Sequence, residues 1–300
     1  MDNKDITFLK KLLLKFDTDI LIESIINFFA ENIKCRNIKF YRKEKQGFRL
    51  IIEKDKAGIK NTSKKDIVVE SDLLSNIHKI QVKDNIAYLP LQYKNKILAI
   101  ISIELSKSKN FKVARYSDLT EFLSAIYYYS RIYEFATKDP LTRIFNKRYF
   151  MYKSNEILDE SIKQDKEFAV LMLDIDHFKH YNDKYGHQIG DIILINIVNT
   201  VDKTISQYDT LFARYGGEEF IIMIKEKNPV EVFTIAETIR KAVKQLKIHN
   251  ESYFWRMTIS LGISLFPAHG TSIGELIKKA DIALYESKKN GRNKTTLYNE

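Results

Sequence analysis

Residues 168–173, FAVLML, form an uninterrupted apolar run that leads directly into Asp174, Ile175 and Asp176. A run of this length without polar alternation is typical of a strand buried on both faces, which needs covering layers above and below it. A carboxylate desolvated at the end of such a strand must be paired, hydrogen-bonded or bound to a cation. The alternative is local: Asp176 would cap a helix beginning near His177, and Asp174 would face water.

The segment RYGGEEF, residues 214–220, places two glycines at the tip of a predicted hairpin. Gly216 and Gly217 permit a reversal with positive φ, and they let a bound group approach the backbone amides because neither residue has a Cβ. A simple hairpin turn is the structural interpretation. It is compatible with a binding site above the turn.

Two glutamates follow this turn and start the next apolar strand. If that strand lies beside the 168–176 strand, Asp174 converges with Glu218 or Glu219. Oxygen-rich clusters of this kind suit Mg²⁺, which is usually held by one or two carboxylates and completed by substrate phosphates. The two segments together therefore predict a divalent-cation site.

Length and composition allow two packed domains, because the chain has 300 residues, of which 44% are hydrophobic and 12% aromatic. A single cysteine, Cys35, excludes an internal disulfide and is expected to pack at the start of a strand. The net charge of +10 favours an anionic partner without choosing among a nucleotide, a nucleic acid and a membrane surface. Neither a membrane span nor an apolar signal core is evident, so we expect a cytoplasmic protein.

The first half begins with two predicted helices, one over about 6–16 and one from Ile20 to about Ile33 that is capped within Asp17-Thr18-Asp19. Strand-like segments follow, the last two separated by Lys94-Asn95 near a tight reversal. These segments are 37–43, 47–54, 66–70, 86–93 and 96–105. Their order resembles a GAF-type sensor domain, and a PAS-type domain is the nearest alternative.

A long helix is predicted from Tyr116 to about Thr137, and Pro140 ends it because proline lacks an amide hydrogen. Its apolar residues recur at alternating steps of three and four, the spacing of a coiled-coil seam. A helix packed only on its own domain is the alternative. The seam would consist of Leu119, Phe122, Ile126, Tyr129, Tyr133 and Ala136. We therefore predict a sensory domain over 1–115, a helical linker over 116–137 and a catalytic domain over 138–300.

Five motifs of the second half resemble the GGDEF domain, the catalytic module of diguanylate cyclases. They are DPLTRIFNKRYF (139–150), LDIDHFKHYNDKYGHQIGD (173–191), RYGGEEF (214–220), TISLGIS (258–264) and ADIALYESKKNGRN (280–293). The resemblance implies a central, mainly antiparallel sheet flanked by helices, similar to the palm of nucleotide cyclases and polymerases. The predicted fold class is thus an α+β protein of two domains.

The resemblance also implies an activity, the condensation of two GTP molecules into cyclic di-GMP with release of pyrophosphate. The reaction is phosphoryl transfer and is expected to use two Mg²⁺ or Mn²⁺ ions per active site. One chain would hold one GTP, so a homodimer of facing domains is required. The N-terminal domain would sense an unknown ligand or protein partner.

The metal ligands implied by the resemblance are Asp174, the backbone carbonyl of Ile175, and Glu218. Glu218 replaces the aspartate of the family's namesake pentad and keeps a carboxylate. Glu219 is expected to support the metal or the reacting hydroxyl. Asp174, Glu218 and Glu219 are therefore the predicted catalytic residues.

Phosphate binding is assigned to cations and to backbone amides. Lys288 and Arg292, four residues apart, are expected on one helical face and match the family's triphosphate-binding cations. Taken alone, two basic residues on a helix are more often solvated. The full predicted phosphate-binding set is Phe178, Lys179, Gly216, Gly217, Lys288 and Arg292.

Base selection is carried over to Asn182 and Asp191. A carboxylate accepts from guanine N1 and the exocyclic amine together, whereas adenine lacks that donor pair. Asp191 therefore favours two molecules of GTP. The alternative for Asn182 is a turn residue before Gly186.

Two further expectations concern regulation. The RxxD tetrapeptide that binds inhibitory product in many relatives is replaced by residues 207–210, QYDT, so strong product inhibition through that site is not expected. Asp139 is expected to pair with Arg214 and fix the linker against the hairpin. Rival functions are a catalytically silent GTP-binding regulator of the same fold and a basic nucleic-acid-binding module.

Overall fold

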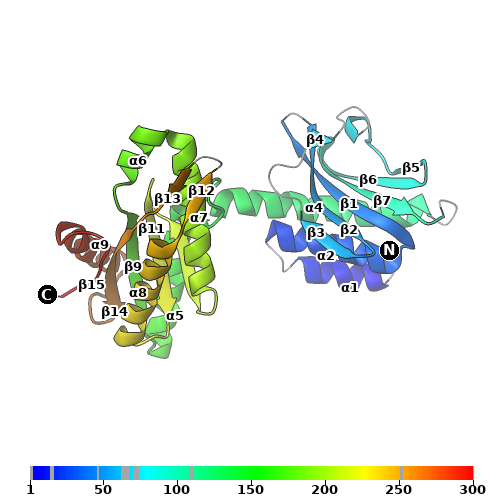
Figure 1. Ribbon diagram of the computed structural model, residues 1–300. Helices are drawn as coiled ribbons and strands as arrows, with labels where there is room; N and C mark the ends of the chain where they lie inside the picture. Colours follow the sequence, from blue (N-terminus) through cyan, green and yellow to red (C-terminus); the bar gives the residue numbers. More distant parts are fainter. Residues whose placement is uncertain are drawn as a thin grey trace. The chain divides into compact units, whose positions relative to one another are not determined.

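The computed structural model describes residues 3–13, 17–45, 47–61, 68–69, 74–107, 111–250 and 253–299. The chain divides into two compact units, Met1–Phe135 and Ala136–Glu300 (Figure 1). The boundary falls near the C-terminal end of helix α4 (Val113–Thr137). The predicted division into a sensory domain, a linker and a catalytic domain stays a prediction.

The N-terminal unit begins with helices α1 (Asn3–Leu12) and α2 (Thr18–Asn32). Asp17 is the N-cap of α2, and its side chain accepts hydrogen bonds from the backbone amides of Asp19 and Ile20 at 2.9 and 3.1 Å. The predicted capping of the second helix is confirmed. The end of the first predicted helix, at Phe16, lies outside the described residues.

The N-terminal sheet is antiparallel at every described pairing, in the order β3-β2-β1-β7-β6-β5 with β4 paired to β2. The described strands are β1 (Cys35–Glu44), β2 (Gly47–Asp55), β3 (Gly58–Asn61), β4 (Val68–Val69), β5 (Gln81–Lys83), β6 (Ile86–Tyr93) and β7 (Lys96–Leu105). The predicted strands are found, except that residues 66, 67 and 70 lie outside the described residues. Sequence reasoning missed β3 and β5, which are short and largely exposed.

Two local predictions in this sheet are confirmed. Lys94 and Asn95 have φ of 46° and 62°, so both central residues of the β6–β7 hairpin are left-handed, as a two-residue type I′ turn requires. Cys35 starts β1 half-buried, and burial raises the pKa of its thiol. A raised pKa disfavours the reactive thiolate, which is consistent with a packing role.

Helix α4 packs on the N-terminal core through Tyr116, Leu119, Leu123 and Tyr127, and the Tyr127 ring contacts Phe40 of β1 at 5.4 Å. The predicted seam is therefore wrong at its first position, because Leu119 belongs to this core. Ile126, another seam position, also packs against this core, whereas Phe122 and Tyr129 are 54% and 64% exposed. Within the described part of the chain, no helix has the length and hydrophobicity to cross a bilayer.

The C-terminal sheet is mixed, in the order β15-β14-β9-β11-β10-β8. Its strands are β8 (Phe145–Asn146), β9 (Phe168–Ile175), β10 (Thr210–Arg214), β11 (Glu219–Lys225), β14 (Ile259–Phe266) and β15 (Thr295–Leu297). The four inner strands pair antiparallel, and β15 and β8 are added in parallel at the two edges. A separate hairpin joins β12 (Ile248–Asn250) to β13 (Tyr253–Trp255).

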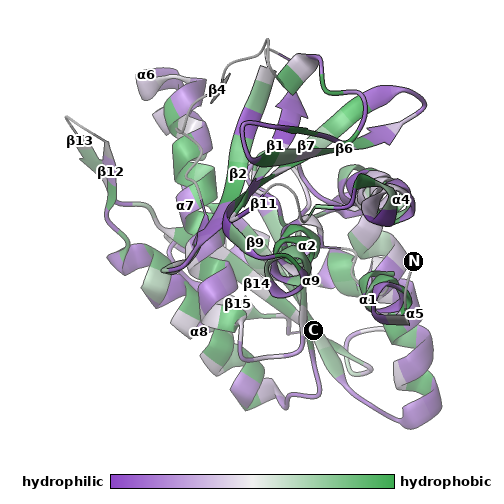
Figure 2. Cartoon of the chain, turned by 90° about the vertical axis from the view of Figure 1, so that its right-hand side faces the viewer, coloured by the Kyte–Doolittle hydropathy of each residue, from purple (hydrophilic) through white to green (hydrophobic). Residues whose placement is uncertain are grey.

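Every residue of β9 is buried, as the apolar run predicted, because helices cover both faces of the sheet. Helices α6 (Phe178–Tyr185), α7 (His187–Ile205) and α8 (Pro229–Gln245) contribute to the core on one face, and α5 (Lys147–Gln164) and α9 (Ile273–Lys289) to the core on the other. Along α8, hydrophobic residues alternate with hydrophilic ones (Figure 2). The buried set is Val232, Ile235, Ala236, Ile239 and Val243, which lie on one helical face.

Candidate active site

Strands β9 and β11 bring the acidic residues together as predicted. Asp174 pairs directly with Glu219 across the two strands, and on its other side it pairs with Ser260 of β14. Like charges placed directly opposite each other on neighbouring strands repel. The register of a buried sheet thus creates a site that needs positive charge.

A lysine of helix α9 supplies part of that charge. Lys288 Nζ lies 2.9 Å from Asp174 Oδ2, and the side chain of Asp174 is only 8% exposed. Burial raises the pKa of Asp174 above its ordinary value despite Lys288, and the charge of Glu219 acts in the same direction. Burial and the charge of Asp174 also raise the pKa of Glu218. One lysine therefore leaves the three carboxylates short of positive charge.

Backbone bonds hold the glycine tip against this cluster. The amides of Tyr215 and Gly216 donate to the carbonyl of Glu219 at 2.8 and 3.1 Å, and the amide of Ile175 donates to the carbonyl of Glu218 at 3.4 Å. The turn does not use the positive φ that these glycines permit, because neither Gly216 nor Gly217 is among the positive-φ residues. A Cβ built on Gly217 meets nothing within 4 Å. The fold itself therefore does not require glycine at 217.

Arg214 ties the tip to the start of the domain. Its Nη1 lies 3.1 Å from Asp139 Oδ1, and its Nη2 donates to the carbonyl of Gly217 at 2.7 Å. Asp139 also accepts from the Thr142 amide at 2.8 Å and the Thr142 hydroxyl at 2.7 Å. The predicted Asp139–Arg214 pair is confirmed, and it holds the glycine turn through a backbone carbonyl.

This pair predicts a measurable pH dependence. Burial alone would raise the pKa of Asp139, but hydrogen bonds from Thr142 and the charge of Arg214 outweigh it and lower the pKa. The stabilisation is therefore present above the unfolded-state pKa and is lost as pH falls through the folded-state pKa. A double-mutant cycle with Asp139→Asn and Arg214→Gln should give a coupling of about 1 kcal/mol at neutral pH that shrinks in acid. Urea unfolding measures it, and additive single effects would contradict the prediction.

Asp176 has a structural role that sequence reasoning missed. It is 3% exposed and accepts from the Thr258 hydroxyl at 2.6 Å, the Ser260 hydroxyl at 2.7 Å and the Asn293 amide at 3.0 Å. The alternative that Asp176 caps the next helix is wrong, because His177 is the N-cap of α6 and makes no side-chain cap bond. The sequence did offer a signal for this role: Thr258 and Ser260 are hydroxyl residues at alternating positions of the strand segment TISLGIS, so both face the same side.

Arg292 does not share a helical face with Lys288, which corrects the sequence prediction. Helix α9 ends at Lys289, and Arg292 follows in a turn with a left-handed φ of 60°. Its amide donates to the carbonyl of Ser287 at 3.0 Å. The bond between Asn293 and Asp176 holds this turn to the end of β9.

The predicted base-selecting residues lie on two successive helices, Asn182 in α6 and Asp191 in α7. Asn182 Oδ1 is buried without a hydrogen-bond partner in the structure. A Cβ at Gly190 would overlap this oxygen, so the glycine preceding Asp191 makes room for the Asn182 amide. Phe178, at the start of α6, is buried in the core, whereas Lys179 is exposed.

The structure thus gathers Asp174, Glu218, Glu219 and Lys288 into one site. Among the described residues, no hydrogen bond or ion pair joins Arg292 to the carboxylates. In the same part of the chain, no group of three or more His, Cys, Asp or Glu residues is arranged to hold a metal ion. The metal site predicted from the sequence does not require such a group, because its ligands are two carboxylates, those of Asp174 and Glu218, and the backbone carbonyl of Ile175.

A mixed sheet with an antiparallel centre, covered by helices on both faces, defines an α+β domain whose site gathers carboxylates beside a glycine turn with a lysine facing them. Residues 136–294 match the family "Diguanylate cyclase, GGDEF domain", which is more than half of the chain. The chain therefore belongs to the GGDEF family.

Named relatives share this half of the chain. It is 33% identical over 218 residues to diguanylate cyclase A of Treponema denticola, covering 70% of this chain and 58% of that protein. It is 39% identical over 165 residues to the probable diguanylate cyclase DgcT of Escherichia coli, covering 54% of this chain and 36% of that protein. The chain thus spans less than two thirds of the length of these relatives.

A solved structure agrees with this assignment. The coiled coil and GGDEF domain of DgcB from Caulobacter crescentus, crystallised in complex with c-di-GMP, matches with a TM-score of 0.55 and 28% identity. The match covers 61% of this chain and 97% of that chain. The GAF resemblance of the N-terminal unit stays a prediction.

Proposed function

We propose that the protein is a diguanylate cyclase, which condenses two GTP molecules into cyclic di-GMP and releases pyrophosphate. One observation carries the proposal: Asp174 and Glu219 face each other across β9 and β11 with Glu218 beside them, and Lys288 is the cation that approaches them. If Lys288 served only in a structural ion pair, one carboxylate would be enough to pair with it. Three carboxylates with one lysine fit a site completed by divalent cations and a phosphate substrate.

The donor set fits Mg²⁺ or Mn²⁺, because burial and mutual repulsion raise the pKa values of Asp174 and Glu218 and bound cations would relieve both effects. Asp174, Glu218 and the carbonyl of Ile175 would hold the metal. When bound, two ions would lower the pKa of the attacking 3′-hydroxyl and neutralise the pyrophosphate leaving group.

Other residues position the substrate. Lys288, already drawn to Asp174, would exchange part of that contact for the triphosphate, with Arg292 and the amides of Phe178 and Lys179 as further phosphate ligands. Glu219 would support the metal-binding carboxylates. Gly217 leaves the space above the turn open for the phosphates, because a Cβ there meets nothing within 4 Å, whereas the absence of a Cβ at Gly216 makes room for the Glu219 carboxylate.

Guanine selection falls to α6 and α7. Rotation of the Asn182 side chain would let its unpartnered Oδ1 accept from the base, and the exposed Asp191 carboxylate can accept from N1 and the exocyclic amine. An adenine ring offers no such pair of donors. The substrate is therefore GTP rather than ATP.

We expect the active form to be a homodimer, because each domain holds one GTP and the two nucleotides must meet face to face. The outward side chains of α4, which include Phe122, Tyr129 and Phe135, are suited to a second copy of this helix. The N-terminal unit, which resembles a GAF domain, would then alter the encounter of the two halves in response to a ligand or protein.

Incubation of the purified chain with GTP and Mg²⁺, followed by product identification, tests this function. We expect cyclic di-GMP and pyrophosphate, no product without the divalent ion, and little product from ATP. GTP binding without turnover would identify a catalytically silent regulator instead. Salt-sensitive DNA binding without a nucleotide product would favour the nucleic-acid-binding alternative.

Gly217→Ala separates folding from phosphate approach. Because the added methyl meets nothing within 4 Å, we expect the free energy of unfolding to change by less than about 0.5 kcal/mol. Turnover should nevertheless fall at least about tenfold if the triphosphate passes over this turn. Unfolding and initial-rate measurements on one preparation check both parts. Full activity in a stably folded variant would contradict the placement of the phosphates.

Product inhibition should be weak, because residues 207 and 210 lack the charges of the RxxD tetrapeptide. The nearby Asp209 is also engaged, with its carboxylate 2.5 Å from Lys225. Titration of the enzyme with cyclic di-GMP checks this expectation. Potent inhibition that is lost on changing Gln207 or Thr210 would contradict it.

A further inference from the structure

The N-terminal unit contains a pocket of about 550 Å³ that the proposed cyclase chemistry does not use. It lies where the C-terminal ends of α2 and β7 meet the first turn of α4. Ligand pockets for small molecules typically span about 300–1,000 Å³. The pocket is therefore large enough for a compact organic molecule rather than a single ion.

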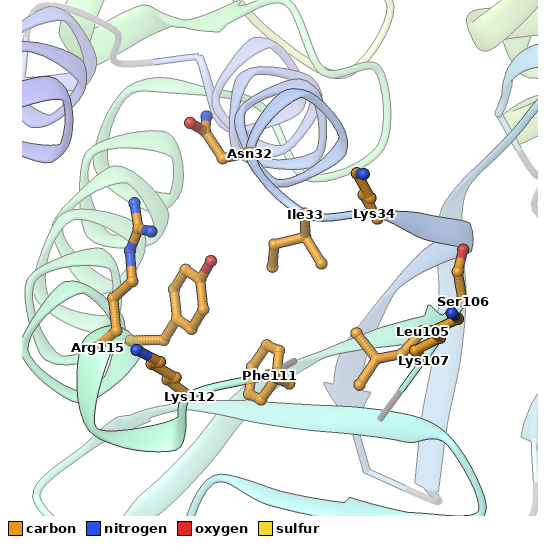
Figure 3. Close-up of a pocket in the computed structure, with 10 residues that line it drawn as sticks. Asn32, Ile33, Lys34, Leu105, Ser106, Lys107, Phe111, Lys112 and Arg115 are labelled. Carbon is orange, nitrogen blue, oxygen red and sulfur yellow. The ribbon is translucent and has the colours of Figure 1, made fainter. Parts of the chain in front are cut away.

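The apolar side of this pocket is aromatic. The rings of Phe111 and Tyr116 are stacked at 4.9 Å and 18°, and Tyr116 in turn contacts Phe29 of the core at 5.9 Å. Figure 3 shows Phe111, Ile33 and Leu105 around the open space. Since aromatic faces prefer offset stacking with other rings, this side fits a flat apolar ring.

The polar side of the pocket carries one sign of charge. Lys34 and Lys107 lie on one side of the space in Figure 3, and Lys112 and Arg115 on the other. The ten lining residues contain these four basic side chains and no acidic one. A concave surface with one sign of charge raises the local concentration of ions of the opposite sign.

A hydrogen bond joins two walls of the pocket, because the amide of Ser106 after β7 donates to the carbonyl of Lys34 after α2 at 3.1 Å. Within the α2 wall, the amide of Ile33 donates to the carbonyl of Phe29 at 2.9 Å and closes the last turn of the helix. Tyr116, at the base, is 5% exposed and belongs to the core of the unit. The aromatic floor is therefore anchored in the core of the unit, and the lysines project from the ends of the sheet and helices around it.

We propose that this pocket binds a small organic anion that joins a flat apolar ring to a phosphate or carboxylate group. The ring stacks on the partly exposed Phe111, which is itself stacked on the buried Tyr116, and the anionic group meets Lys34, Lys107 and Lys112. Both halves of the ligand are needed, because exposed lysines alone bind anions weakly and aromatic rings alone select no charge. The site is independent of the cyclase chemistry and concerns the N-terminal unit only.

Fluorescence titration of the full chain with anilinonaphthalene sulfonate, an aromatic anion, tests the pocket. A variant with glutamine at Lys34, Lys107 and Lys112 should bind the probe about tenfold or more weakly, and higher salt should weaken binding to the parent chain. A variant with glutamine at the exposed lysines 56, 79 and 83 has the same net charge and should bind like the parent chain.

Competition then identifies the anionic group. Displacement by adenosine monophosphate but not benzoate indicates a phosphate ligand, and the reverse indicates a carboxylate ligand. Adenosine and inorganic phosphate, which each carry half of the required chemistry, should displace the probe poorly. Equal probe affinity in the two triple variants, or displacement by adenosine as effective as by its monophosphate, would overturn the proposal.

Discussion

Glu218→Gln should abolish measurable cyclase activity while leaving the fold intact or slightly more stable. Glutamine preserves the shape of the side chain but removes the charge expected to hold a divalent cation. Loss of groups that only orient a metal ligand costs about 10–100-fold, so loss of a ligand should cost at least about 100-fold in kcat/KM. The structure adds a second expectation, which concerns stability.

The pKa of Glu218 is raised by burial and by the charge of Asp174, so its ionised form is disfavoured in the folded chain. The folded state therefore loses stability as pH rises through this pKa, and the glutamine variant lacks that loss. At neutral pH we expect an unfolding midpoint equal to or above that of the parent chain. Thermal unfolding and initial rates of cyclic di-GMP formation measure the two effects.

Glu160→Gln is the matched control, because it makes the same chemical change at an exposed position of α5. It should leave both activity and stability within error of the parent chain. If Glu218→Gln retained more than a tenth of the parent activity, the assignment of Glu218 to the metal would be lost. A loss of activity that merely followed a loss of fold would refute the stability argument.

The part of the carboxylate site that lies at the ends of β9 and β11 could be predicted from the sequence. The apolar run 168–173 fixed β9 as a buried strand, and the neighbouring hairpin then placed Asp174 beside the glutamates. The carboxylate distinguishes the registers of this strand, because a slip by one residue would move Asp174 to the other face of the sheet, away from Lys288. Local pattern and tertiary structure therefore agree there.

Other features depend on contacts between distant segments, which periodicity does not encode. Asp176 follows the same strand end as Asp174, yet hydroxyls of β14 and an amide after α9 turn it into a buried anchor. The spacing of four from Lys288 predicts that Arg292 lies on the same helix, but the bond of its amide to the carbonyl of Ser287 belongs to the turn that ends α9. The division of α4 into a packed and an exposed face likewise cannot be read from its sequence alone, because it depends on where the N-terminal sheet lies against the helix.

Gly262→Ala is expected to destabilise the C-terminal unit strongly. A Cβ at Gly262 of β14 would overlap the Ala280 carbonyl oxygen and the Leu284 amide nitrogen of α9, and would lie 2.8 Å from the carbonyl carbon of Ala283. These are backbone atoms, so no side-chain rotation relieves the clash. The helix has to move as a whole.

The strand cannot move instead, because Gly262 is paired with Met172 of β9 on one side and Thr296 of β15 on the other. Two hydroxyls also hold the helix close: Ser287 donates to the Leu261 carbonyl at 2.8 Å, and Ser264 donates to the Leu276 carbonyl at 2.7 Å. We expect a loss of about 3 kcal/mol or more in the free energy of unfolding, at the upper end for overpacking.

Gly274→Ala provides the control for this change, because Gly274 lies in the first turn of the same helix and its added Cβ meets nothing within 4 Å. Alanine in a helix is favoured over glycine, so this variant should be unchanged or up to about 1 kcal/mol more stable. Urea unfolding of the two variants, with GTP turnover as a second readout, makes the comparison. Displacement of α9 also carries Lys288 away from Asp174, so activity in Gly262→Ala should fall even at temperatures where the variant remains folded. Equal stability of the two variants would show that α9 does not pack on the β14 backbone at this glycine.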